Sequence, residues 1–187
     1  MNKMEKKKIW IGIFLSFILI SSTLGFVLSY ENSSDTNTSN NEIIINGIKI
    51  QKIQDNVFAV DNNGIRVIFN YLPEDLQNIT LPEFSLLSDK IYIIFEPEQQ
   101  DNNLDLLIQK LTMGIRSANI RAVTACSREE SCDIDIPVKK CDNDAVYISR
   151  KNISRTYLME KCLVLEGSDI DLNMYVDSLN YRISGVK

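Results

Sequence analysis

The feature that most constrains this chain is an uncharged stretch of 22 residues, Ile9 to Tyr30, close to its N-terminus. An α-helix of that length rises roughly 33 Å, which is enough to cross a hydrocarbon core of about 30 Å. Trp10 and Tyr30 stand at its two ends, where aromatic rings favour the headgroup layer. The stretch therefore predicts a transmembrane signal-anchor helix over residues 9–30.

A cleaved signal peptide is the alternative interpretation of the same stretch. It would have an apolar region of about 7 to 15 residues followed by a small-x-small site. The end of this stretch, Gly25 to Tyr30, has no good site of that kind. Residues 1–8 carry four lysines and one glutamate, whereas Glu31 and Asp35 follow the stretch. The positive-inside rule therefore predicts a cytoplasmic basic stub over residues 1–8 and a single-pass protein of the cell membrane whose C-terminal part is extracytoplasmic.

Residues 31–41 contain no apolar side chain and predict a polar, flexible tether. We expect one extracytoplasmic domain over residues 42–187. The charge balance is +3 over the first 30 residues and −8 after them. Such an excess of acid argues against nucleic acid as a partner, because phosphate binding needs clustered Lys and Arg. The chain has no histidine, which excludes Ser-His-Asp and Cys-His nucleophiles and histidine metal sites.

The first half of the domain is predicted to be rich in β-structure. Asn46-Gly47 between two isoleucine-rich runs predicts a hairpin with a type I′ turn. Residues 57–60 and 65–69 predict a second hairpin, with a longer loop over residues 61–64. The unbroken apolar run Ile91–Phe95 predicts a strand in the middle of a sheet. Further strands are expected at residues 121–125, 145–149, 156–159 and 162–165, the last three as a small meander.

Two helices are predicted from apolar residues that recur with helical spacing. The first face consists of Leu104, Leu107, Ile108, Leu111 and Ile115, with Asn102 as the expected N-cap. The second face consists of Leu172, Tyr175, Val176, Leu179 and Ile183, after a capping box formed by Ser168 and Asp171. This phase places Asp177 on the outer side of the last helix. The order of elements predicts an α+β or two-layer α/β domain, a mixed β-sheet covered by two helices.

The four cysteines are Cys126, Cys132, Cys141 and Cys162, and all follow the predicted span. An even number in an oxidising compartment favours disulfides. The gaps of 5, 8 and 20 residues between them do not match the close pairs of structural zinc sites, although zinc, an iron–sulfur cluster and free thiols remain alternatives. Of three possible connectivities, we favour Cys126 with Cys132 and Cys141 with Cys162.

Four N-x-S/T triplets are candidate glycosylation sites, conditional on a host that performs this modification. They begin at Asn32, Asn37, Asn78 and Asn152. The first two lie in the predicted tether, where an exposed chain would accept a glycan. The triplets therefore predict a glycoprotein.

Two acidic groups are candidate ligand sites. Glu96, Glu98 and Asp101 follow a buried strand and precede a helix, where α/β proteins often bind ligands. The second group surrounds Cys132 and consists of Glu129, Glu130, Asp133 and Asp135. Either group could offer carboxylate oxygens to Ca²⁺, but neither has the spacing of a known calcium loop. A solvated acidic surface is the simpler interpretation, and we expect no metal, no cofactor and no catalytic residue.

The C-terminal third carries three motifs: Ala125-Cys126-Ser127-x-x-Glu130-x-Cys132, Asp135-Ile136-Pro137-Val138-x-x-Cys141 and Cys162-x-Val164-x-Glu166-Gly167-x-Asp169. They resemble short, membrane-anchored, uncharacterised archaeal proteins. In that group a cysteine-bearing loop, an Ile-Pro-Ile-like step and a cysteine-bearing strand that ends in Gly precede a last amphipathic helix. The resemblance implies this layout and a recurring four-cysteine pattern, and it implies no activity.

These features favour a membrane-anchored extracytoplasmic interaction module that binds an envelope protein or glycan. One alternative is a carboxylate-based envelope glycan hydrolase, in which Glu96 or Glu98 would lie roughly 5 to 9.5 Å from an acid near Cys132. Another is an accessory subunit of a membrane complex, which would expose an apolar patch larger than several hundred Å².

Overall fold

The computed structural model describes residues 42–45, 47–84, 88–133 and 135–185, which belong to one compact unit. The predicted span, the tether and the sites at Asn32 and Asn37 lie outside these residues. Among the residues that the structure describes, no helix is both long and apolar enough to cross a membrane.

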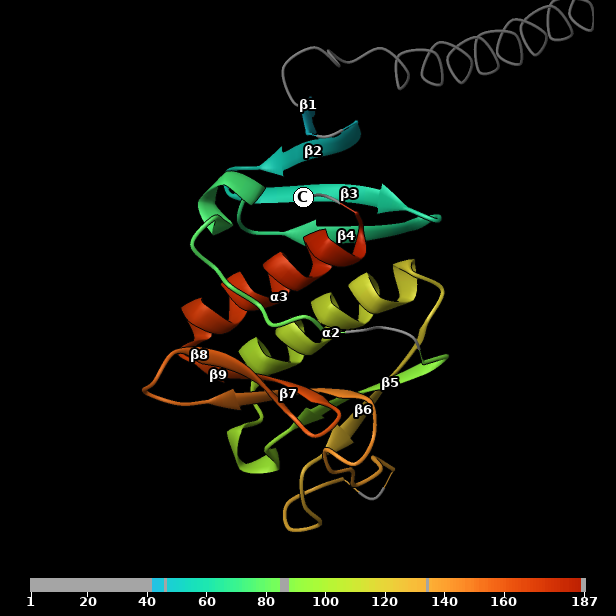
Figure 1. Cartoon of the computed structure of the whole chain (residues 1–187), viewed down its shortest axis with the longest axis vertical. Helices are drawn as coiled ribbons and strands as arrows, with labels where there is room; N and C mark the ends of the chain where they lie inside the picture. Colours follow the sequence, from blue (N-terminus) through green and yellow to red (C-terminus); the bar gives the residue numbers. More distant parts are fainter. Residues whose placement is uncertain (1–41, 46, 85–87, 134, 186–187) are drawn as a thin grey trace, which may run out of the picture. The chain divides into compact units, whose positions relative to one another are not determined.

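The first sheet is antiparallel and has the order β1-β2-β3-β4 (Figure 1). Its strands are β1 (Glu42–Ile45), β2 (Ile48–Gln54), β3 (Val57–Asn62) and β4 (Ile65–Phe69). Both predicted hairpins are present, and the second turn is tighter than expected. Only Asn63 and Gly64 connect β3 to β4, with φ of 49° and 76°. A two-residue turn with both φ positive matches the twist of the strands, which explains this Asn-Gly pair.

The second sheet is mixed and has the order β6-β5-β7-β9-β8. Its strands are β5 (Lys90–Phe95), β6 (Arg121–Cys126), β7 (Ala145–Arg150), β8 (Arg155–Met159) and β9 (Cys162–Gly167). The predicted meander is wrong in its order, because β9 pairs in parallel with β7 and leaves β8 at the edge. Every residue of β9 is buried, whereas every residue of β8 is exposed or half-buried. The most apolar strand thus takes the interior position.

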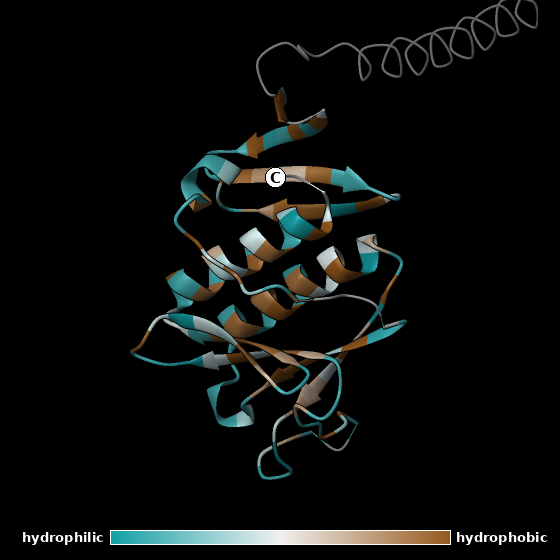
Figure 2. Cartoon of the chain, viewed as in Figure 1, coloured by the Kyte–Doolittle hydropathy of each residue, from teal (hydrophilic) through white to brown (hydrophobic). Residues whose placement is uncertain are grey.

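The helices are α2 (Asn102–Ser117) and α3 (Asp169–Ile183), with short 3₁₀ turns η1 (Pro73–Leu76) and η2 (Pro97–Gln99). The α+β class is confirmed, but the expectation of one sheet in two layers is wrong. The helices lie between the two sheets, as Figure 1 shows. One hydrophobic core joins both helices to the second sheet, and another joins the first sheet to α3 and η1. Figure 2 shows hydrophobic residues along the strands and helices of these layers.

The ends of the helices follow the rules of capping. The capping box of Ser168 and Asp171 is present at the start of α3. At α2 the cap is Asp101 and not the predicted Asn102. Asp101 has an extended backbone, with φ of −154°, and its carboxylate accepts the N–H of Leu104 at 2.9 Å. The helical backbone already includes Asn102, so its side chain cannot take that role.

The position of Asp177 corrects the prediction for the last helix. This residue is completely buried, whereas the helical phase placed it on the outer side. Because α3 is covered by the second sheet on one side and by the first sheet on the other, it has no fully solvated side. Tyr181 also points toward the first sheet, where its ring stacks on Phe69 with ring centres 3.9 Å apart.

Candidate functional site

The first predicted ligand site, after β5, is occupied by contacts within the chain. The Glu96 carboxylate accepts hydrogen bonds from Ser149 Oγ at 2.7 Å and from Tyr147 Oη at 3.1 Å, and it lies 3.3 Å from Lys151 Nζ. Burial and the adjacent negative charge of Glu96 raise the pKa of Tyr147 to about 12, so this hydroxyl stays protonated and donates. Glu96 therefore joins the ends of β5 and β7.

Arg150, the last residue of β7, joins the N-termini of both helices. Its guanidinium contacts the Asp101 carboxylate at 2.8 and 2.9 Å and Asp169 at 2.5 Å. The hydrogen bonds from Arg150 and from the Leu104 N–H hold the pKa of Asp101 at about 2. Helix N-termini favour negative charge, and here the chain's own carboxylates supply it. The edge of the sheet where α/β proteins often bind ligands is thus occupied by this network.

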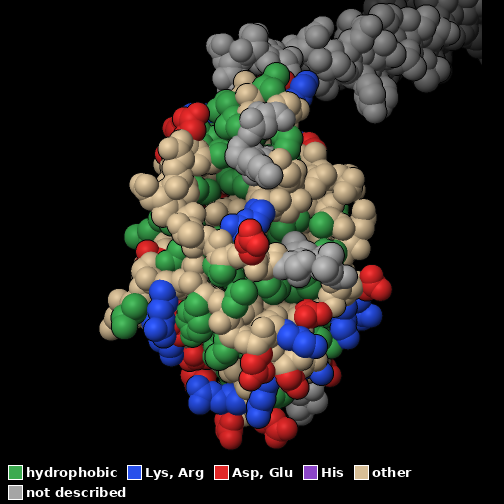
Figure 3. Space-filling model, viewed as in Figure 1, with side chains coloured by type: hydrophobic (Ala, Val, Ile, Leu, Met, Phe, Trp, Pro, Cys, Tyr) green, Lys and Arg blue, Asp and Glu red, His purple; other side chains and the backbone are tan. Residues whose placement is uncertain are grey.

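The second acidic group does not gather into a site. Glu129, Glu130, Asp133 and Asp135 are all exposed. Within the described residues no group of three or more acidic or cysteine side chains could hold a metal ion. The loop approaches the first acidic group through Arg128, which lies 2.9 Å from Glu98. The charged side chains on the face drawn in Figure 3 gather mostly over the second sheet and its loops.

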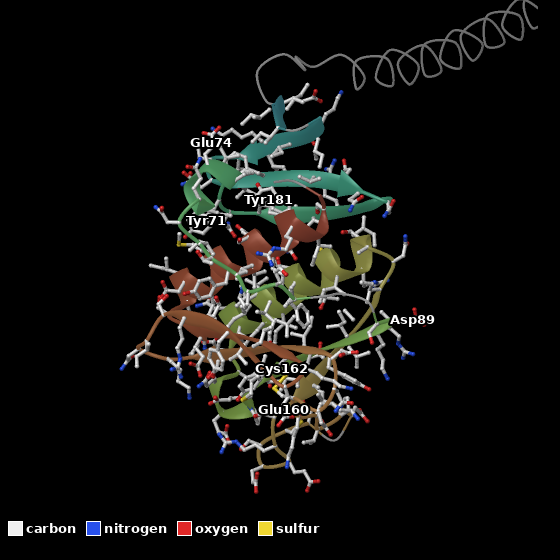
Figure 4. All side chains as sticks on the ribbon, in the orientation of Figure 1. Tyr71, Glu74, Asp89, Glu160, Cys162 and Tyr181 are labelled. Carbon is white, nitrogen blue, oxygen red and sulfur yellow. A yellow bond between two sulfur atoms is a disulfide. The ribbon has the colours of Figure 1, made fainter. Side chains whose placement is uncertain are left out.

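The cysteines form the disulfides Cys126–Cys132 and Cys141–Cys162, the connectivity that the spacing favoured. Their Cα atoms are 6.1 and 5.0 Å apart, within the range that a disulfide needs. The Cys126–Cys132 link packs on the helix side of the second sheet, whereas Cys141–Cys162 lies on the opposite face, where Lys139 Nζ is 5.1 Å from the centre of the Tyr92 ring. Figure 4 shows Cys162 in this part of the domain.

Two of the predicted glycosylation sites can be placed in the structure. Asn78 follows η1, and Asn152 lies in the connection between β7 and β8. Both residues are exposed. Their positions are therefore accessible to a modifying enzyme.

A groove that the sequence did not indicate lies between the helices and the first sheet. It has a volume of about 1080 Å³. We call it the α2–β4 groove, and it is formed by one side of α2, the first turns of α3 and the end of β4. Its lining residues are Asn56, Ile68, Asn70, Tyr71, Asp75, Asn103, Leu106, Gln109, Lys110, Met113, Asp169, Ile170, Asn173 and Met174.

The rim of the α2–β4 groove exposes large apolar side chains. Leu106 is 62% exposed, Ile170 is 65% exposed and Met113 is 42% exposed. Residues Leu106 and Met113 are seven positions apart, so they lie on the same side of α2. This side is opposite the face that packs on the second sheet. Apolar side chains gathered around a concave surface are typical of a site that binds another molecule.

The floor of the groove is a buried ion pair between the two helices. Lys110 is 9% exposed, and its Nζ lies 2.5 Å from Asp177 Oδ1. The same amine donates to the side-chain oxygens of Asn70 at 2.7 Å and Asn173 at 3.2 Å. Burial lowers the pKa of Lys110 and raises that of Asp177. Each charge is compensated by its partner, so the floor offers no free charge to a ligand.

Asp177 also fixes the corner that follows β4. Its Oδ2 accepts the backbone N–H groups of Asn70 at 2.7 Å and Tyr71 at 3.1 Å. The hydroxyl of Tyr181 donates to the Tyr71 carbonyl at 3.0 Å, and Figure 4 shows both tyrosines at this corner. The groove wall formed by β4 is thereby held to α3 by buried hydrogen bonds.

The sequence carried one signal for this groove. Leu106 and Met113 on α2, and Ile170 and Met174 on α3, recur with helical spacing outside the two predicted core faces. A second apolar row on a helix indicates a second contact surface. The contribution of Asn56 and Asp75 had no local signal, because Asn56 lies between β2 and β3 and Asp75 lies in η1, and both come near the helices only in the folded chain.

Comparison with known proteins does not identify the chain. No family model, no curated protein and no solved structure matches the chain. The assignment of a function therefore rests on the residues of the groove and on the sequence.

Proposed function

We propose that this protein is a membrane-anchored extracytoplasmic interaction module that binds a segment of an envelope protein in the α2–β4 groove. The predicted helix over residues 9–30 would hold it in the membrane, with residues 1–8 in the cytoplasm. Two disulfides support an oxidising compartment for the domain.

The observation that carries the proposal is the exposed apolar rim of the groove. Leu106, Met113 and Ile170 are aliphatic, and in the free domain they expose surface that a partner would remove from water. The hydroxyl-rich surface of a glycan would cover such side chains poorly, whereas the side chains of a polypeptide would cover them well. The groove therefore favours an envelope protein over an envelope glycan.

Amide side chains between these apolar residues support a polypeptide partner. Asn56, Asn103 and Gln109 line the groove and make no side-chain hydrogen bond to any described residue. A carboxamide offers both donors and an acceptor, as a peptide bond does. The groove can thus satisfy the backbone of a bound segment as well as its apolar side chains.

Co-purification from native membranes tests this function. The full chain would be isolated in a mild detergent as the wild type, as Leu106→Glu and as Ile153→Glu, and its partners would be quantified by mass spectrometry. Ile153 is 63% exposed and does not line the groove, so its variant is a matched control. We expect a partner that is retained by Ile153→Glu and lost by Leu106→Glu. Equal recovery by all three proteins would contradict binding in the groove.

A further inference from the structure

Three cations gather around one tyrosine near the start of the second sheet, on the face opposite the helices. The four residues are Lys90 and Tyr92 of β5, Arg121 of β6 and Lys139 of the loop between β6 and β7. Tyr92 belongs to the apolar cluster on that face and is only 9% exposed. Lys90 Nζ lies 4.7 Å and Lys139 Nζ lies 5.1 Å from the centre of the Tyr92 ring. We call these four residues the Tyr92 cluster.

The register of the sheet brings Arg121 to the cluster. Arg121 is the direct partner of Lys90 in the parallel pair of β5 and β6. Lys90 and Tyr92 are two positions apart, so Lys90 leaves the sheet on the face of the tyrosine ring. Like charges directly opposite each other on neighbouring strands lower the stability of a sheet. An anion bound between these cations would remove the repulsion.

The cations of the Tyr92 cluster are not neutralised by the part of the chain that the structure describes. No ion pair between described residues includes any of them. Of the neighbouring acids, Asp144 accepts the hydroxyl of Ser88, and Asp89 forms no ion pair with a described residue. The charge balance after residue 30 is −8, yet these positive charges remain available to a ligand.

The position of Lys139 is fixed by the backbone around it. Its N–H donates to the Cys126 carbonyl at 2.9 Å, and the preceding residue, Val138, bridges in parallel to Cys126. Disulfides hold the chain on both sides of Lys139, at Cys132 and at Cys141. A ligand that binds a constrained segment loses less free energy to ordering of the backbone. The cluster is therefore preorganised to bind.

The chemistry of the Tyr92 cluster favours a tetrahedral oxyanion. The guanidinium of Arg121 matches two oxygens of a phosphate, and each lysine adds a point charge. A phosphate or sulfate group has enough oxygens for three cations, whereas a carboxylate has two. The positive charge of Lys90 at the Tyr92 hydroxyl, followed by the charges of Lys139 and Arg121, lowers the pKa of Tyr92. Such a hydroxyl is a stronger hydrogen-bond donor.

We propose that the Tyr92 cluster binds a phosphate or sulfate group, with Lys90, Arg121 and Lys139 around the anion and the Tyr92 hydroxyl as a further donor. None of these residues lines the α2–β4 groove, so the site is separate from the one that carries the proposed function. Either site can fail its test without the other. The same anionic group occurs as a free ion and as an ester, for example in a lipid headgroup, and the experiment distinguishes these sources.

Calorimetric titration of the full chain in a mild detergent tests the proposal. The probes are inorganic phosphate, sulfate, glycerol phosphate and acetate, all at one pH and at one ionic strength set with chloride. Arg121→Gln and Lys139→Gln each remove one charge of the cluster, and Tyr92→Phe removes the hydroxyl but keeps the ring. Lys52→Gln removes one exposed charge of the first sheet and is the matched control.

We expect saturable binding of phosphate or sulfate, with acetate at least tenfold weaker. The affinity should fall at least fivefold with Arg121→Gln and Lys139→Gln, at least twofold with Tyr92→Phe, and less than twofold with Lys52→Gln. Tighter binding of glycerol phosphate than of inorganic phosphate would identify an ester as the ligand, and the reverse order would identify the free ion. The absence of saturable binding, equal affinity for acetate, or an equal loss with Lys52→Gln would overturn the proposal.

Discussion

Lys110 and Asp177 form the buried ion pair at the floor of the α2–β4 groove. Replacing one partner alone should lower the free energy of unfolding of the domain. Asp177→Ala would leave the Lys110 ammonium buried without its charge partner, and two backbone N–H groups would lose their acceptor. Loss of one partner of a buried pair typically destabilises a protein by about 3–5 kcal/mol. Urea unfolding of the domain should show a loss of this size.

The double variant Lys110→Met with Asp177→Leu provides the control for that prediction. It removes both charges and keeps apolar volume, so the part of the loss that comes from the unpaired Lys110 charge should return, whereas the cost of the lost acceptor for the Asn70 and Tyr71 N–H groups should remain. A change of no more than about 0.5 kcal/mol for Asp177→Ala, which is typical of a surface position, would show that the ion pair is not buried in solution.

The effect of replacing Gly114 on stability depends on the residues around it more than on its position in a helix. Replacing glycine by alanine within a helix normally stabilises it by about 1 kcal/mol. Here the new Cβ would lie 1.9 Å from Asn180 Oδ1 of α3, so the buried Asn180 side chain would have to leave its position and its hydrogen bond to the Lys110 carbonyl, or the helices would have to separate. We expect Gly114→Ala to destabilise the domain by about 1–3 kcal/mol in thermal unfolding, as overpacking does.

Truncation of the Asn180 side chain tests whether its contact with the added Cβ causes the loss of stability. In the presence of Asn180→Ala, the added methyl group at position 114 has space, although the hydrogen bond from Asn180 to the Lys110 carbonyl is lost. The effect of Gly114→Ala should then be much smaller than in the wild type. Equal effects in both backgrounds would place the close contact elsewhere.

At the scale of elements, Arg150 connects α2, α3 and β7, and this connection should depend on pH. The pKa of Asp101 is lowered to about 2 by Arg150 and by the helix N–H groups. A lowered folded pKa means that the carboxylate contributes stability above its unfolded pKa of about 4, and that this contribution is lost as the pH falls to about 2. Arg150→Gln should therefore lose stability at pH 6 and show a weaker loss between pH 4 and pH 2. Parallel pH profiles for the two proteins would contradict the linkage.

The two disulfides should differ in their contribution to stability. Cys141–Cys162 closes a loop with a sequence separation of 21, against 6 for Cys126–Cys132. Loop entropy gives about 3 kcal/mol for the longer link and about 1 kcal/mol less for the shorter one. Paired Cys→Ser variants, compared by denaturant unfolding, should preserve this order. A larger loss for the Cys126–Cys132 pair would mean that its loop supports the second sheet more than the β7–β9 region does.

The elements that the sequence predicted well are those with local causes. The two hairpins of the first sheet, the capping box at Ser168 and the apolar face of α2 all depend on neighbours within a few residues. The partition of the strands into two sheets and the insertion of β9 between β7 and β8 depend on contacts far apart in the chain. Asp177 illustrates the consequence, since its burial follows from a second sheet above α3 that helical periodicity alone does not reveal.

At the scale of the whole molecule, the groove proposed for binding lies apart from the disulfides and the Arg150 network. The helices cover one face of the second sheet, the Cys141–Cys162 disulfide lies on the other face, and Arg150 joins the end of β7 to the N-termini of both helices. The groove lies on the other side of the helix pair, where the first sheet leaves apolar side chains of α2 and α3 exposed. The sequence predicted the cysteine pairing, and it indicated the groove only through a second apolar row on the helices.

Photo-crosslinking in native membranes tests the central claim, that the α2–β4 groove holds a partner protein. A benzoylphenylalanine in place of Leu106 or Ile170 would lie at the rim, and the same residue in place of Ile153 would lie outside the groove. We expect one discrete protein adduct from both rim positions and none from position 153. No adduct at the rim, or the same adduct from all three positions, would contradict it.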